Sequence, residues 1–337
     1  MIIKKFIIVL LSSLIITGCM KNDRIIIERF VPVSISPVMT LEETKALLDN
    51  TNITGERVRV QVAKGDGSVA YNIDGDSKIT LTYSVPNWVL STMVYLSSDN
   101  AKLYAYCPCP ADPTTVESGS YSSLKRSLNI PATVALSSQV DYLWAYQAKT
   151  VSEGANDINN ANATVSLKLN HALTQVAFVI YRDNFTGVGS FTALKIKDNS
   201  VTPGLIINKS GENDLAVAIA NGAITGGETT SEITVNTIGN TITENSDPGV
   251  DPAVLKTKVN GYALLVPVTI ADITKVQFTF TIDSRDYSVS LTGGGGVTWS
   301  AGQQYIYKVK LSGTQMVIES VTVTPWTSNY GGSVDIQ

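Results

Sequence analysis

Two cysteines and a single histidine are the side chains of this sequence best suited to nucleophilic, redox or metal chemistry. Cys107 and Cys109 flank a proline in the run AYCPCP, and His171 follows a stretch of alternating apolar residues. A disulfide between the two cysteines would be tight, because extended residues two apart lie ~6.5 Å or more between Cα atoms. His171 has neither a second histidine nor a cysteine close to it in sequence, so a metal site or catalytic triad lacks partners. We interpret the cysteines as small buried residues on one face of a strand with Leu103 and Ala105, and His171 as the maker of a structural hydrogen bond.

The other motifs that could carry chemistry are incomplete. There is no Gly-x-Ser-x-Gly nucleophile motif and no Ser-x-x-Lys in a plausible pocket context. Gly293–Gly296 is followed by neither a Lys-Ser/Thr pair nor a helix, which favours a hairpin over a phosphate loop. Asp247 with Asp251, and Asp74 with Asp76, do not continue into a calcium-loop pattern. We assign no catalytic, cofactor or metal residue and expect no enzyme; a glycosidase, whose carboxylate pair would be invisible in sequence, is ranked last.

The N-terminus has the pattern of an export signal. Lys4 and Lys5 precede an apolar stretch from Phe6 to Ile16, which is shorter than the ~20 residues of a spanning helix. Thr17-Gly18 before Cys19 is typical of a bacterial lipobox. We expect residues 1–18 to be removed and Cys19 to carry lipids that hold the protein at a membrane. An ordinary secretory signal with an incidental cysteine is the other interpretation.

Composition narrows the class of protein further. Hydrophobic residues make up 44% of the 337 residues and charged residues 16%, which is globular rather than disordered. Thr, Ser, Val and Ile dominate, with Gly and Asn between them, and this favours an all-β fold. The net charge of −4, or −6 once Lys4 and Lys5 are lost, and the lack of a basic stripe argue against a nucleic-acid partner.

Apolar residues alternate with polar ones in short runs along most of the chain, as they do in half-buried strands. The clearest predicted strands are 57–64, 77–83, 88–96, 103–106, 141–146, 165–171, 176–180, 276–282, 287–291, 305–311 and 317–324. A change of parity between Val165–Leu169 and Val176–Ile180 predicts a bulge or break within 171–175. One helix is expected from Thr40, with Glu43 at the capping-box position. Residues 221–251 are interpreted as an exposed excursion with one or two short strands.

Turn signals every ~8–12 residues predict two β-sandwiches in tandem. The polar, Asn-rich stretch 151–163 is the expected boundary. We therefore assign 19–36 to an N-terminal tether and possible displaced strand, 37–163 to a first sandwich and 164–337 to a second.

Several segments also carry a family resemblance. They are DYLWA from Asp141, LNHALTQVAF from Leu169, YALLVP from Tyr262, WSAGQQY from Trp299 and VTVTPW from Val321. Together with the lipobox, and in this order, they resemble the fimbrillin-like subunits of type V pili of Gram-negative bacteria. The Cys-Pro-Cys run departs from the aromatic residues expected there, so no family-wide role is carried to its cysteines.

The resemblance implies two transthyretin-like β-sandwiches and a mechanism of assembly. A surface protease with arginine specificity would cut at Arg24 or Arg29, and Ile25–Ile27 or Phe30–Ile35 would belong to the displaced strand or flank it. A C-terminal strand of another subunit would then fill the groove by β-augmentation and extend a filament. The candidate donor is 317–337, with Val317, Val321, Val323 and Trp326 as its apolar side chains. The implied partners are other fimbrial subunits and a host or bacterial surface ligand. The implied location is the outer membrane, reached through the lipid anchor, and the cell-surface fimbrium.

A monomeric surface lipoprotein that binds glycans is the alternative function. Trp88, Trp144 and Trp299 are the aromatic side chains nominated to stack on sugars, although core positions are more usual for tryptophan. Whether a fimbrial subunit of this kind would form stalk, anchor or tip is left open.

Overall fold

The fold is all-β, as predicted. The computed structural model describes residues 30–39, 57–71, 77–84, 87–151, 154–212, 214–313 and 315–326. The expected helix from Thr40, Cys19, Arg24, Arg29, Asp74, Asp76 and the tail 327–337 lie outside these ranges. Within them the only α-helix is α1 (Pro252–Thr257), capped by the Asp251 side chain, and four single turns of 3-10 helix complete the helical part. These turns are η1 (Pro113–Thr115), η2 (Tyr121–Ser123), η3 (Leu136–Ser138) and η4 (Ile273–Lys275).

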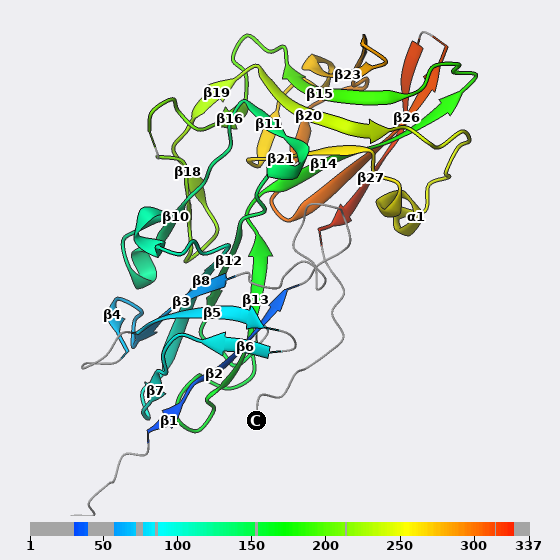
Figure 1. Ribbon diagram of the computed structural model, residues 1–337. Helices are drawn as coiled ribbons and strands as arrows, with labels where there is room; N and C mark the ends of the chain where they lie inside the picture. The colour runs from blue at the N-terminus through cyan, green and yellow to red at the C-terminus, as the bar shows by residue number, and fades with distance from the viewer. Residues whose placement is uncertain are drawn as a thin grey trace, which may run out of the picture.

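The first half of the chain forms one large sheet at the lower end of an elongated molecule (Figure 1). Alternation in β3 directs Val58, Val60 and Val62 into one apolar core. The N-terminal strand β2 lies at an edge and runs parallel to β13. The order is β2 (Ser34–Met39), β13 (Thr164–His171), β12 (Leu143–Gln147), β8 (Ala101–Cys107), β3 (Arg57–Lys64), β5 (Lys78–Ser84) and β6 (Asn87–Leu90), with β4 (Val69–Ala70) beside β3.

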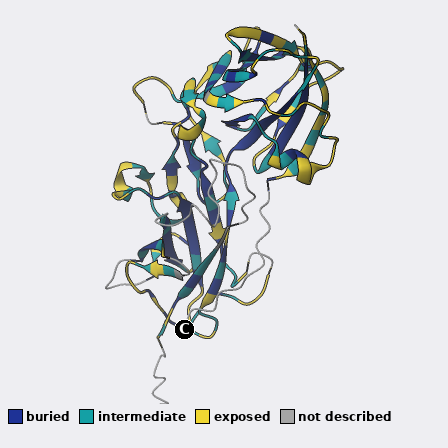
Figure 2. Cartoon of the chain, turned by 45° about the vertical axis from the view of Figure 1, so that its right-hand side comes forward, coloured by how far each residue is buried: buried dark blue, intermediate teal, exposed yellow. Residues whose placement is uncertain are grey.

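The second half forms two sheets that pack face to face. The four-stranded sheet has the order β21 (Gly261–Leu265), β14 (Thr174–Asp183), β26 (Gln303–Ser312) and β27 (Gln315–Pro325). The five-stranded sheet has the order β11 (Thr133–Ala135), β20 (Glu232–Thr241), β15 (Ser190–Asp198), β23 (Val276–Ile282) and β24 (Arg285–Ser290). Phe178 meets Phe278 and Phe280 across the layers, edge to face at 4.8 and 5.1 Å between ring centroids. Figure 2 shows the buried residues on the inner faces of these strands.

A third apolar cluster joins the two halves. It includes Tyr104 and Tyr106 from β8, Leu264 from β21 and Ile306 from β26. A small sheet crosses the same region, because β10 from the first half pairs with β17 from the second; its order is β18 (Ile224–Thr225), β17 (Ala216–Ala218), β10 (Lys125–Ser127) and β9 (Glu117–Ser118). Strand β11 also leaves the first half and pairs parallel with β20. The halves are therefore bonded to each other by strands as well as by packing.

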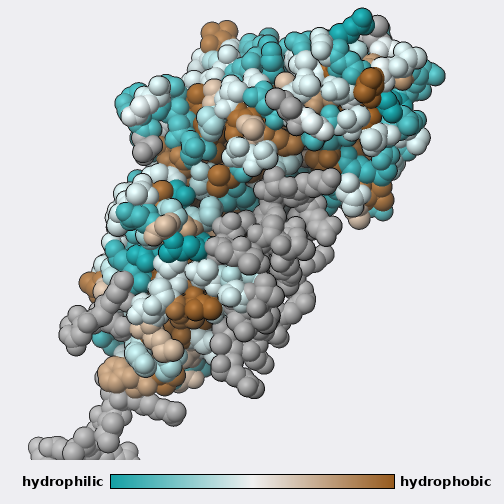
Figure 3. All heavy atoms as spheres, viewed as in Figure 1, coloured by the Kyte–Doolittle hydropathy of each residue, from teal (hydrophilic) through white to brown (hydrophobic). Residues whose placement is uncertain are grey.

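Three short ladders complete the structure. They are β1 (Val31–Pro32) with β7 (Tyr95–Leu96), β16 (Leu205–Ile207) with β19 (Glu228–Thr230), and β22 (Val268–Ile270) with β25 (Val297–Trp299). On the uncovered part of the face in Figure 3, hydrophobic residues form small separate groups among hydrophilic ones, so this view shows no broad apolar interface.

The chain passes from the first sheet to the second group between His171 and Thr174, which confirms the predicted break. The assigned boundary at 163/164 falls immediately before β13, and β13 pairs with β12 and β2 of the first sheet. β2 itself extends past the end of the assigned tether at residue 36. The prediction for 221–251 was wrong in one respect: β20 runs for ten residues beside β15, because Ile233 and Val235 point into the core.

Candidate functional site

The candidate donor strand is docked in its own sandwich as β27. It pairs antiparallel with β26, from Gln303 opposite Pro325 to Ser312 opposite Gln315 (Figure 1). Among the described residues no strand pairs with its other edge. A terminal edge strand is held by one ladder only, and its free edge offers N–H and C=O groups to another chain.

A β-bulge divides β27 into two segments. Lys308 lies opposite Ser320 and Val309 lies opposite Ile318, so Glu319 is the extra residue. Because of this insertion, Val321 and Val323 share the inner face with Tyr307 and Tyr305, whereas Val317 lies opposite Lys310 on the outer face.

The inner face of β27 lines an open apolar groove of about 480 Å³. The groove lies between β27 and β24, the last strand of the five-stranded sheet, and Val289 and Leu291 form its other wall. Val321 and Val323 are 50% and 52% exposed although they face inward, because no described strand continues the opposite sheet beyond β24. The sandwich is open on this side.

Charged groups fasten the outer face of β27 at the bulge. Glu319 accepts a hydrogen bond from Tyr181 Oη at 2.7 Å and lies 3.3–3.4 Å from the amines of Lys310 and Lys308. Burial disfavours the charged form of Glu319, but these hydrogen bonds outweigh it and lower its pKa. Burial likewise disfavours charged Lys308, yet its bonds to Asp247, at 2.7 Å, and to Glu319 leave its pKa raised. Residue spacing does not indicate this cluster, because its members come from four separate segments.

The C-terminal end of β27 is fixed by Trp326. Its backbone N–H donates to Gly302 O at 2.7 Å, and its ring stacks on His171 with centroids 4.0 Å apart and planes 7° apart. His171 Nδ1 lies 3.0 Å from the buried carboxylate of Asp141, which confirms the predicted structural hydrogen bond. Since a carboxylate only accepts, this contact places a proton on Nδ1. The segments DYLWA and LNHAL contain Asp141 and His171, but nothing in them indicates Trp326 as the third member.

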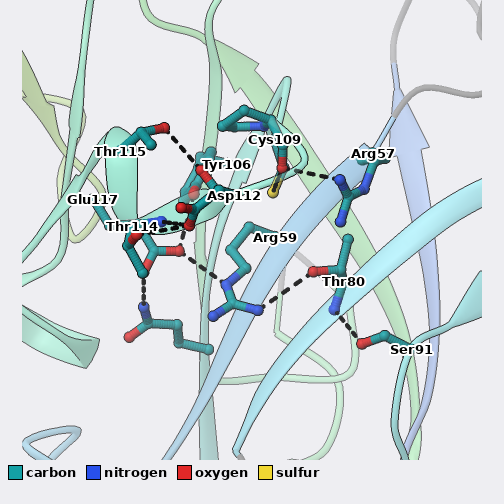
Figure 4. Close-up of polar contacts among 12 residues, drawn as sticks. Arg57, Arg59, Thr80, Ser91, Tyr106, Cys109, Asp112, Thr114, Thr115 and Glu117 are labelled. Carbon is teal, nitrogen blue, oxygen red and sulfur yellow. Dashed lines mark hydrogen bonds and ion pairs between the residues drawn. The ribbon is translucent and has the colours of Figure 1, made fainter.

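The polar cluster around Glu117 is a structural network (Figure 4). Glu117 accepts hydrogen bonds from Arg59 Nε and from Tyr106 Oη, each at 2.9 Å.

The prediction that Cys107 and Cys109 share one face of a strand was wrong. β8 ends at Cys107, which lies in the core of the first sheet, while Cys109 lies in the cluster between the halves. Both thiols are buried, and burial raises the pKa of Cys109, which suppresses the reactive thiolate.

The remaining candidates serve the fold. Gly293–Gly296 connects β24 with β25. Asp247 binds Lys308, and Asp251 caps α1. Across the described ranges, no group of three His, Cys, Asp or Glu side chains is arranged to hold a metal ion, and no helix there is long and apolar enough to span a membrane.

The three nominated tryptophans differ in access. Trp299 is fully buried and donates to Tyr307 Oη at 3.1 Å, so it offers no surface to a sugar. Trp144 lies against Gly222, whose φ of 72° and missing side chain let the turn approach the ring. Trp88 is half-buried on the edge strand β6, with its ring 5.2 Å from that of Tyr83.

Comparisons with known proteins agree with this architecture. The model of the fimbrillin-like family matches residues 44–326. A candidate cell-adhesion protein of Bacteroides ovatus is similar with a TM-score of 0.56 and 14% identity, covering 90% of this chain and 100% of its own. A candidate cell-adhesion protein of Bacteroides uniformis has a TM-score of 0.55 and 14% identity, with 88% and 99% covered. A fimbrial protein of Bacteroides vulgatus has a TM-score of 0.54 and 13% identity, with 88% and 99% covered. No protein of curated function matches the chain.

Proposed function

The chain belongs to the fimbrillin-like family, and from this premise we propose that it is a structural subunit of a cell-surface fimbria and assembles with other fimbrial subunits by strand exchange. The observation that carries the proposal is the position of β27, a terminal edge strand beside an open apolar groove. Such a strand needs to break only one ladder to leave its sheet. Once extended, it would add to a sheet edge of a second subunit through main-chain hydrogen bonds, with alternate side chains in pockets.

The proposed acceptor is the site that β2 now occupies. Ile35 of β2 is fully buried in the first core, and β2 pairs with β13 from Ser34 to Met39. A donor strand that replaced β2 would gain the same apolar contacts with Val165 and Leu167. Because each subunit would give one strand and receive one elsewhere on its surface, the contact would be heterologous and would continue into a filament.

Proteolysis would cut the chain on the N-terminal side of β2. Arg24 and Arg29 precede β1 and β2, so a cut by an arginine-specific surface protease would leave β2 attached to the chain. The site beside β13 could then accept a donor strand only if β2 withdrew from it. After the cut, β2 would do so as an N-terminal arm that is still attached to the chain. Export through the signal at 1–18 and lipids on Cys19 would hold the uncut subunit at the outer membrane, and the assembled fimbria would support adhesion.

The test uses the mature chain with Cys19→Ser, cut with an arginine-specific protease and concentrated. We expect filaments by electron microscopy and a ladder of species on an unboiled gel. A second chain that also carries Arg24→Lys and Arg29→Lys is the matched control, since it keeps the charges but resists the protease, and it should stay monomeric. Persistent monomers after complete cleavage would contradict assembly by strand exchange.

A further inference from the structure

Trp326 joins the last strand to the first half of the chain. β27 lies in the four-stranded sheet of the second half, whereas His171, on which the Trp326 ring stacks, is the last residue of β13 in the first sheet. Trp326 is only 5% exposed and lies in the apolar cluster between the halves. The end of β27 is therefore fixed to a different sheet from the rest of the strand.

The surface that receives Trp326 is rigidly placed. Asp141 holds the His171 ring, and His171 also pairs with Leu143 of β12 in the ladder of the first sheet. Next to it, Ala172 donates its N–H to Tyr142 O at 2.8 Å. The hydrogen bond to Asp141 fixes the orientation of the His171 ring, so that its face is presented to Trp326 for stacking.

The remainder of β27 beyond the bulge has little burial of its own. Val321 and Val323 border the open groove, and among the described strands only β26 pairs with β27. Since burial of apolar area is the main source of stability, the Trp326 ring supplies a large part of what holds this segment. An edge segment of this kind is expected to open locally at a low free-energy cost once the ring is removed.

β13, which carries His171, depends in turn on β2. From Thr164 to Leu169, β13 is paired with β2, whereas its ladder with β12 involves only Asn170 and His171. Side-chain bonds from Gln147 to Ser166 O and from Lys168 N to Gln147 supplement this ladder. Withdrawal of β2 would leave β13 without its main ladder and would loosen the strand that positions His171.

We propose that Trp326 is a latch that keeps β27 docked, and that β13 connects this latch to β2, so that withdrawal of the N-terminal strand promotes release of the C-terminal one. The proposal rests on the proposed strand exchange, because it describes how the two strands of one subunit would be coordinated. Coupling between withdrawal of β2 and release of β27 requires an element whose conformation depends on both strands. β13 with His171 is that element.

The latch is tested by hydrogen exchange of the peptide covering 315–326 in the full mature chain. Trp326→Ala should speed exchange there by roughly three- to tenfold, the range that corresponds to an aromatic pair. Trp326→Phe, which keeps a flat ring on His171, should restore most of the protection. Trp88→Ala, at a half-buried tryptophan on β6, is the matched control and should leave 315–326 unchanged. Unchanged exchange in Trp326→Ala would overturn the latch.

The connection through β13 is tested with two equally buried isoleucines of the first core. Ile35 lies on β2 and Ile79 lies on β5, away from β13 in the sheet order. Ile35→Ala should speed exchange in 164–171 and in 315–326, whereas Ile79→Ala should not affect 315–326. Equal effects of the two variants on 315–326 would mean general destabilisation and would overturn the connection.

Assembly after cleavage separates the two proposals. If the wild-type chain forms no ladder but Trp326→Ala still exposes 315–326, the proposed function fails and the latch stands as a structural contact. If the wild-type chain assembles and neither Trp326→Ala nor Ile35→Ala alters exchange in 315–326, the latch fails and the proposed function stands.

Discussion

Glu319 determines both the shape of β27 and its charged contacts with the neighbouring strands. It is the inserted residue of the bulge, and it accepts from Tyr181 while lying against Lys308 and Lys310. A carboxylate with a lowered pKa stabilises the folded state above its unfolded pKa, and that stabilisation is lost as pH falls through the folded pKa. The attachment of β27 should therefore weaken in acid.

We expect the protection of 315–326, measured relative to the intrinsic exchange rate at each pH, to fall between about pH 5 and about pH 3, around and below the ordinary glutamate pKa of about 4.3. Glu319→Gln should remove much of this pH dependence, because the amide does not titrate. Glu212→Gln, at an exposed ion pair with Lys209, is the control and should leave the acid response of 315–326 intact. A pH response that survives in Glu319→Gln would assign it to other groups.

At the scale of single elements, β27 carries exposed valines on both of its faces. Val317 and Val321 are comparably exposed and both border the groove, but Val317 lies opposite Lys310 on the outer face, whereas Val321 and Val323 lie on the inner face. This gives a matched pair of substitutions in one strand. It separates the contribution of the inner face from that of apolar exposure in general.

The double variant Val321→Thr and Val323→Thr should lower assembly after cleavage and change the stability of the monomer by less than about 1 kcal/mol, because partly exposed positions contribute little. Val317→Thr, with a similar exposure on the other face, should leave assembly near the wild-type level. The measurements are thermal unfolding of the uncut chain and the ladder of the cut one. Equal loss of assembly in both variants would show that the face is irrelevant.

Period-2 alternation predicted most strands well, because burial of one face acts directly on sequence. β3 has the predicted limits, and β27 extends the predicted 317–324 by two residues at one end and one at the other. Alternation could not predict the parallel pairs β2–β13 and β14–β26, since these pairs join residues distant in sequence. The Asp251-Pro252 start of α1 carries a capping signal, since Asp251 accepts a hydrogen bond from the Ala253 N–H and the proline stands in the first turn.

The candidate site was less predictable than the strands. Alternation places Val317, Val321 and Val323 on one side, and only the insertion of Glu319, visible in the pairing with β26, separates them. The His171–Trp326 stack and the Lys308–Glu319–Asp247 cluster depend on which sheets come together. Sequence identified the elements of the site, and tertiary packing decided the contacts between them.

At the scale of the whole molecule, the N-terminal arm and the C-terminal strand belong to opposite halves that share one apolar cluster. The position of the arginines before β1 makes a specific prediction about the cut protein. Mass spectrometry of the assembled, cleaved chain should find an N-terminus at Ile25 or Phe30, with β2 still present. An assembled chain that begins after Met39 would contradict withdrawal of β2 as an attached arm.

The bulge at Glu319 also bears on solubility. A flat, eleven-residue apolar edge would be a template for uncontrolled aggregation. An inserted residue increases the local twist and interrupts the row of unpaired main-chain groups, and a charge at that position adds repulsion between like edges. Glu319, which fastens β27 in its own sheet, therefore also disfavours edge-to-edge aggregation of the unassembled chain.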